Sequence, residues 1–205
     1  MVLVTVVVGS GIMGTNLSDD DGVALIINQL STSMALVLLI LVLGVVSGAH
    51  FNPVVSLYEL LLKKINVQRF TFYTLSQVAG AITGAILANT MFGLEALQTS
   101  TKDRIAIGNG IGEILATAGL IIVIGVLVNR NQQNYIPAAV AAWIGSAYYF
   151  TASTSFANPA VTIGRAFTDT FSGIAPSAVA FFVLFQLIGL GVGMLAVNVL
   201  KDANV

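Results

Sequence analysis

The sequence predicts an all-α integral membrane protein with six transmembrane helices and two re-entrant half-helices. Three observations lead to this prediction. Charged residues are scarce, the uncharged stretches between them are long enough to cross a bilayer, and a short segment that begins with Asn-Pro occurs twice in related surroundings. We expect the chain to form one domain over residues 1–205.

The composition excludes most other classes of protein. The 205 residues include 8 Lys and Arg and 9 Asp and Glu, or 8% charged residues, against roughly 25% in soluble domains. Hydrophobic residues make up 57% of the chain, which excludes both a soluble globule and a disordered chain. The net charge of −1 leaves no basic patch for nucleic acid. With no cysteine and the single histidine His50, we expect no metal site and no cofactor.

The positions of the charges define the predicted spans. A transmembrane helix needs about 20 mostly apolar residues. The uncharged stretches from residues 22, 131 and 170 are longer than one span requires, so each contains a span and something more. We predict spans over about 1–17, 23–46, 70–93, 108–128, 136–153 and 174–199, and half-helices over about 53–62 and 159–168.

Both predicted half-helices follow an Asn-Pro pair, Asn52-Pro53 and Asn158-Pro159. Proline suits the first helical turn, and asparagine is a strong N-cap whose amide N–H groups remain free to face outward. Two such helices meeting tip to tip would bring two positive dipole ends together, which repels cations. The arrangement suits a pore for uncharged polar molecules, because segments of this kind are tolerated only beside protein or a water-filled cavity.

The two Asn-Pro segments belong to a longer internal repeat. "SGAHFNPVVSL" from Ser47 resembles "STSFANPAVTI" from Ser153, at an offset of 106 residues. "QVAG" from Gln77 matches "QLIG" from Gln186, at an offset of 109. Units of three spans insert in opposite directions, so we predict inverted repeats over about 1–106 and 107–205, with the functional site where they meet.

The basic residues predict an orientation. Five of them fall at one end of the predicted bundle, namely Lys63, Lys64, Arg69, Arg130 and Lys201. Three fall at the other end, namely Lys102, Arg104 and Arg165. The end with five basic residues is predicted to be cytoplasmic. The first span, over residues 1–17, would be about 25 Å long, short of a bilayer core of about 30 Å. We therefore expect the chain to begin inside its first helix.

At these residues the sequence resembles the aquaporin and aquaglyceroporin family, the major intrinsic proteins. "SGAHFNP" and "FANPA" are similar to the family's two Asn-Pro-Ala boxes, and "GEILAT" from Gly112 is similar to the start of its fourth helix, with Glu113 as the buried glutamate. The resemblance implies a homotetramer with one pore per subunit, in the plasma (inner) membrane of a bacterium or archaeon. The boxes would be Asn52, Pro53 and Val54, and Asn158, Pro159 and Ala160.

The chain departs from the family at the selectivity filter. The family normally places an arginine directly after the second box, where this sequence has Val161. Counting from the boxes places the other three filter positions at Thr32, Ser146 and Ser155. The count to Ser146 crosses a loop and could be off by one residue, which would place that position at Ala147. Small residues would make this filter wide, and it lacks the fixed cation. The resemblance is to bacterial members with a non-arginine filter, some of which are thought to carry metalloid species.

The predicted function is a passive channel in the lipid bilayer for water and small neutral solutes: glycerol-like polyols, urea and undissociated metalloid acids. One alternative is a water-selective channel, which requires Tyr148 or Phe156 to narrow the filter. A second is an ion-coupled transporter, for which Glu59 and Glu113 are the candidate coupling groups. An enzyme is disfavoured because no nucleophile–base pair is visible.

Three polar residues outside the boxes admit two interpretations each. His50 could sense pH at the cytoplasmic mouth, but packing of its loop against the half-helix is favoured. Glu113 could couple to protons, but bonding to loop backbone is favoured. Arg165, seven residues after Asn158 and toward the outer mouth, could replace the missing arginine, but an ion pair with Asp169 is favoured.

Overall fold

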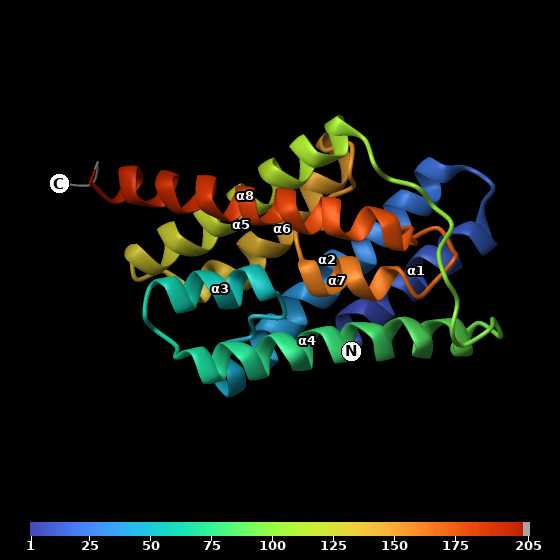
Figure 1. Ribbon diagram of the computed structural model, residues 1–205, viewed down its shortest axis with the longest axis horizontal. Helices are drawn as coiled ribbons and strands as arrows, with labels where there is room; N and C mark the ends of the chain where they lie inside the picture. Colours follow the sequence, from blue (N-terminus) through green and yellow to red (C-terminus); the bar gives the residue numbers. More distant parts are fainter. Residues whose placement is uncertain (203–205) are drawn as a thin grey trace.

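The computed structural model describes residues 1–202, and every regular element within them is helical (Figure 1). Long helices run side by side along the molecule, and the two short helices α3 and α7 lie among them (Figure 1). The elements are α1 (Val2–Leu17), α2 (Asp21–Ser47), α3 (Pro53–Leu61), α4 (Val67–Met91), α5 (Ile107–Asn129), the 3₁₀ turn η1 (Gln133–Tyr135), α6 (Ile136–Phe150), α7 (Pro159–Arg165) and α8 (Pro176–Asp202).

Each of the six predicted spans overlaps one α-helix, with bounds that differ by up to three residues, and each predicted half-helix segment contains a short one. Four helices, α2, α4, α5 and α8, are long and apolar enough to cross a membrane. Helices α1 and α6 are shorter, with 16 and 15 residues. Helix α6 ends at Phe150, before the predicted residue 153, because the chain becomes extended at Thr151. The backbone N–H and the hydroxyl of Thr151 both donate to the carbonyl oxygen of Ala147, at 3.2 Å and 2.6 Å.

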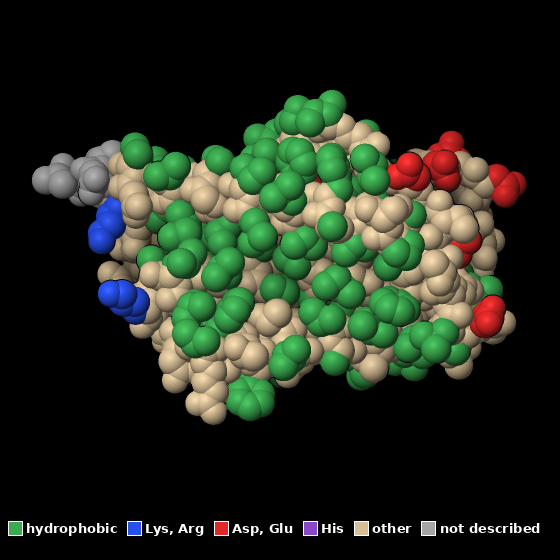
Figure 2. Space-filling view, in the orientation of Figure 1, with side chains coloured by type: hydrophobic (Ala, Val, Ile, Leu, Met, Phe, Trp, Pro, Cys, Tyr) green, Lys and Arg blue, Asp and Glu red, His purple; other side chains and the backbone are tan. Residues whose placement is uncertain are grey.

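The sides of the molecule are apolar, and its exposed charges lie toward the ends. Large side chains such as Leu38, Val45 and Leu195 point outward on α2 and α8 and are more than half exposed. Figure 2 shows hydrophobic side chains spread along the body on one face, basic side chains at one end and acidic side chains at the other. Buried polar side chains lie inside, including Asn28, Glu113 and Gln186. Apolar sides around a polar interior are the pattern of a protein surrounded by lipid.

Small residues allow α7 to lie directly against α4. A Cβ atom added at Gly164 would stand 2.8 Å from both the Cβ and the carbonyl oxygen of Ala81. Backbone cannot move aside as the end of a flexible side chain can, so this position requires glycine. The close contact fixes α7 against a long helix and therefore fixes the side chains that α7 presents on its other faces.

We predict that Gly164→Ala lowers the free energy of unfolding by about 1–3 kcal/mol, as overpacking does. The matched control is Gly191→Ala in α8, where an added Cβ meets no atom within 4 Å and alanine favours the helix. Thermal unfolding in detergent, followed by the fluorescence of Trp143, measures both. Equal melting temperatures in the two variants would contradict the close contact.

Candidate functional site

The half-helices α3 and α7 begin in the same way, with an asparagine cap and proline in the first turn. The Asn52 side-chain oxygen accepts a hydrogen bond from the Val54 backbone N–H at 2.9 Å. The Asn158 oxygen accepts from the N–H groups of Ala160, at 3.0 Å, and Val161, at 3.3 Å. These caps agree with the sequence prediction and satisfy N–H groups that a helix start leaves unpaired.

The same two asparagines also join the two halves of the chain. The Asn52 Nδ2 group donates to the carbonyl oxygen of Ala157 at 2.7 Å, and the Asn158 Nδ2 group donates to that of Phe51 at 2.9 Å. The expectation that both N–H groups of each amide are free is therefore wrong for one of the two. One N–H holds the opposing loop, and the other is left beside the cavity that both asparagines line.

The backbone leading into each half-helix repeats as well. Residues 48, 49 and 51 have φ angles of 77°, 46° and 50°, and residues 154, 155 and 157 have φ angles of 60°, 54° and 48°. The two sets are related by the 106-residue offset found in the sequence. Only Gly48 adopts this left-handed region freely, since the others are not glycine. The unusual backbone directs the carbonyl groups of Phe51 and Ala157 toward the opposing asparagines.

A buried polar network holds the second loop. Both oxygens of the Glu113 side chain accept backbone hydrogen bonds, from the N–H of Phe156 at 2.9 Å and of Ala157 at 2.8 Å. Gln186 donates to Glu113 at 2.6 Å and to the Thr162 hydroxyl at 2.9 Å. The favoured interpretation of Glu113, bonding to loop backbone, matches these contacts.

The corresponding network in the first half uses His50. Gln77 donates to the Ser56 hydroxyl at 3.0 Å, and His50 Nδ1 lies 3.0 Å from the same hydroxyl. The His50 ring packs edge-on against Tyr73, with centroids 5.1 Å apart. These contacts match the favoured packing role. The importance of Gln77 and Gln186 was not predicted, although the repeat of "QVAG" as "QLIG" was the signal for it.

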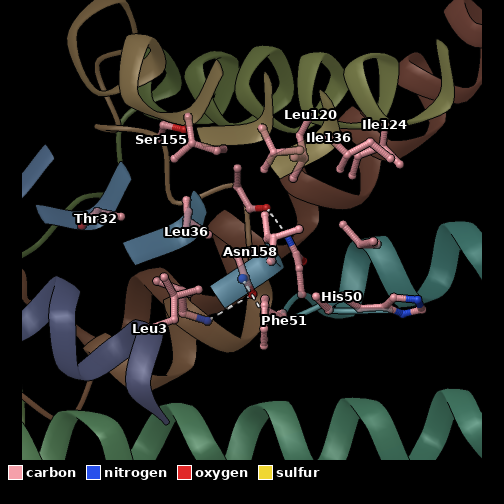
Figure 3. Close-up of a pocket in the computed structure, with 18 of the residues that line it drawn as sticks. Leu3, Thr32, Leu36, His50, Phe51, Leu120, Ile124, Ile136, Ser155 and Asn158 are labelled. Atoms are coloured by element: carbon pink, nitrogen blue, oxygen red, sulfur yellow. Dashed lines mark hydrogen bonds between the residues drawn. The ribbon is translucent and has the colours of Figure 1, made fainter. Parts of the chain in front are cut away.

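The residues of both loops line one cavity of about 280 Å³. Much of the lining is aliphatic, with Leu36, Leu120 and Ile124 among its residues, while Asn52 and Asn158 provide polar groups. In Figure 3 Asn158 lies near the middle, with Thr32 and Ser155 toward one side and His50 toward the other. A mostly apolar cavity with a few polar groups suits molecules that carry both hydroxyl and hydrocarbon faces.

Three of the four predicted filter residues line this cavity, namely Thr32, Ser155 and Val161. Ser146 does not, and the prediction for it is wrong, because this side chain is exposed on the outer face of α6. Tyr148 lines the cavity instead, and its hydroxyl donates to Thr32 Oγ1 at 3.3 Å. The count from the second box back to α6 crosses the loop between them, and it missed the cavity-facing residue by two positions. Two residues along a helix turn a side chain by about 200°, so the prediction fell on the wrong face of α6.

Arg165 also lines the cavity, and its favoured ion pair with Asp169 is absent. Its Nε donates to the carbonyl oxygen of Ser172, and its guanidinium carbon lies 3.4 Å from the centroid of the Phe156 ring. The i,i+4 argument fails because α7 ends at Arg165, so Asp169 does not lie on the same helix. Asp169 is exposed and accepts hydrogen bonds from the Thr101 backbone N–H at 2.8 Å and the Thr101 hydroxyl at 3.1 Å.

For Glu113, we predict that replacement by alanine strongly destabilises the fold, because the N–H groups of Phe156 and Ala157 lose their acceptors. Each buried unpaired group costs about 1–3 kcal/mol. Glu113→Gln keeps one acceptor oxygen and has an intermediate effect. Yield and melting temperature in detergent measure the series. A Glu113→Gln protein of unchanged stability that lost a pH-dependent flux would contradict the structural role and favour proton coupling.

The Asp169 carboxylate predicts acid sensitivity of the loop that contains Thr101. The hydrogen bond from the backbone N–H of Thr101 holds the pKa of this carboxyl below its usual value. In an unfolded chain the pKa of an aspartate side chain is about 3.9. The stabilisation is therefore complete above that value and is lost as pH falls through the lower pKa of the folded state. Hydrogen exchange at residues 97–103, corrected for intrinsic rate, should accelerate on acidification. In Asp169→Asn the exchange should already be fast at neutral pH, and an unaltered rate in this variant would refute the link.

Comparisons with known proteins agree with this arrangement. The family described as Major intrinsic protein matches residues 1–152. The aquaglyceroporin AqpS of Rhizobium meliloti (strain 1021) is 46% identical over 189 residues, which cover 91% of this chain and 80% of that protein. Human aquaporin-1 is 32% identical over 96 residues, 44% of this chain and 36% of that protein.

A solved structure supports the fold. The X-ray structure of the aquaglyceroporin from Plasmodium falciparum matches with a TM-score of 0.68, over 96% of this chain and 88% of that chain, at 23% identity. The sequence resemblance, the paired half-helices and these matches lead to one conclusion. The chain belongs to the major intrinsic protein family, whose members are membrane channels rather than enzymes.

Proposed function

We propose that this protein is a passive channel for water and small neutral solutes that carry several hydroxyl or amide groups, such as glycerol-like polyols, urea and undissociated metalloid acids. The observation that carries the proposal is the side chain at position 161. A valine, without charge and without hydrogen-bonding groups, lines the cavity directly after the second Asn-Pro-Ala box. The relative named an aquaglyceroporin, 46% identical, supports a solute larger than water.

The lining explains how such a solute would pass. A polyol leaving water needs hydrogen bonds to replace those it gives up. The second N–H groups of Asn52 and Asn158 would supply donors near the middle of the path, while Leu36, Leu120 and Ile144 would contact the hydrocarbon face. The N-terminal ends of α3 and α7 oppose the entry of cations at the same place. Nothing in this passage requires a chemical step or an energy source.

The contacts of the two acids proposed for ion coupling argue against that role. Glu113 already accepts from three donors, and Glu59 pairs with Lys64 at 3.2 Å. The water-selective alternative has firmer support, because Tyr148 lies where a small residue was predicted. An aromatic ring narrows a passage more than serine does. The two functions differ in one measurable quantity, the ratio of solute flux to water flux.

Stopped-flow swelling of proteoliposomes in gradients of water, glycerol and arsenous acid measures that ratio. We expect the protein to pass all three, and passage of water alone would establish the water-selective alternative. Val161→Arg should reduce glycerol and arsenous acid flux more than water flux, because a long cationic side chain then enters the passage. Val161→Leu is the control for bulk without charge. A uniform reduction of all fluxes in Val161→Arg would argue against a filter at this position.

We also propose that the protein is a homotetramer with one pore per subunit in the plasma membrane of a bacterium or archaeon. The resemblance of the boxes to the family and the bacterial relative support both statements. The exposed apolar sides of α2 and α8 offer surface for neighbouring subunits as well as for lipid. Native mass spectrometry from detergent micelles tests the assembly, with four times the 21.3 kDa chain mass expected.

A further inference from the structure

Arg165 is a buried cation without a counter-ion. Its side chain is 3% exposed, and the one ion pair among residues 1–202 joins Lys64 to Glu59. A charge buried without a partner is strongly unfavourable, so in membrane proteins such groups face a water-filled cavity and mark a functional site. Arg165 is in that position, since it lines the cavity that contains Asn52 and Asn158.

The guanidinium is held at one edge and open at the other. Its Nε donates to the Ser172 carbonyl oxygen, and its plane is covered by the ring of Phe156, 3.4 Å from the guanidinium carbon. The two terminal amino groups make no hydrogen bond to any of the described residues, while the side chain borders the cavity. A fixed fork of free donors is well suited to bind oxygen atoms of a solute.

A second unpartnered polar group lines the same cavity. Ser155 is also 3% exposed, and its hydroxyl oxygen is buried without a hydrogen-bond partner among the described residues. It adjoins Phe156, the residue that covers the guanidinium. Figure 3 shows Ser155 and Thr32 on the side of Asn158 that is away from His50. A buried hydroxyl without a partner is costly unless water or a ligand satisfies it.

We propose that Arg165 and the Ser155 hydroxyl form a solute-binding station in the outer half of the pore, and that Arg165 is a specificity-determining residue. Its ligand is a neutral polyhydroxy solute, whose oxygens accept from the guanidinium and whose hydroxyl donates to Ser155. The fixed charge also repels monovalent cations. The identity of the solute rests on the proposed function, but the exclusion of cations does not.

The position of Arg165 explains how the chain functions without a cation at Val161. The two residues lie four apart in α7, so they share a helix face and are separated by about 6 Å along its axis. Both line the cavity. The positive group is therefore one turn farther out, which leaves the passage beside Val161 free of a long side chain.

The decisive experiment compares Arg165→Met with Arg165→Lys in proteoliposomes. Arg165→Met removes the charge and keeps a side chain of similar length. We expect the leakage of potassium ions to rise about tenfold, which corresponds to lowering the free-energy barrier to their passage by about 1.4 kcal/mol. Arg165→Lys retains the charge and should exclude potassium as the wild type does. The matched control is Arg104→Met, because the guanidinium carbon of this arginine also lies near Phe156, 5.4 Å from the ring centroid, but Arg104 does not line the cavity.

Folded Arg165→Met protein that leaks no more potassium than wild type and Arg104→Met would overturn the proposal. Because this readout does not depend on glycerol flux, it separates failure of the proposal from failure of the proposed function. Should Arg165→Met not fold, Ser155→Val decides. It should lower the ratio of glycerol to water flux about tenfold with no ion leak, and an unchanged ratio would refute the binding station.

Discussion

Two hydrogen bonds at the centre of the molecule determine where almost everything else lies. Each boxed asparagine caps its own half-helix and donates across to the carbonyl group that precedes the other box. The half-helices cannot separate without leaving these amides unpaired away from water, which is costly. The cavity, its polar groups and the course of α7 are all positioned from this junction.

Polar side chains around the junction maintain it. Glu113 and Gln186 support the second loop from α5 and α8, while Ser56, His50 and Gln77 support the first. The two supports are not equal. A carboxylate that accepts backbone N–H groups holds a loop more firmly than a network of neutral groups, so the second loop is the more strongly fixed. It is also the loop that carries Ser155 and Phe156.

The sequence was sufficient for the features that follow from local rules. The scarcity of charge marked the spans, the Asn-Pro pairs marked the helix starts, and the 106-residue offset matches the repeated backbone angles. It was insufficient wherever a side chain's direction depended on a loop. The filter position was predicted at Ser146 or, with a slip of one residue, at Ala147, and neither lines the cavity, because a count through irregular chain carries no rotational information. The pairing of Arg165 with Asp169 assumed a helix that ends four residues earlier.

The cross-links between the halves contact backbone carbonyl oxygens and not side chains, and this bears on how the two halves could diverge. The accepting residues are Phe51 in one half and Ala157 in the other, which differ greatly in size although they make the same bond. Each half could therefore change its lining residues without damaging the junction. An architecturally symmetric scaffold can in this way acquire a direction-dependent interior, with a histidine toward one mouth and an arginine toward the other.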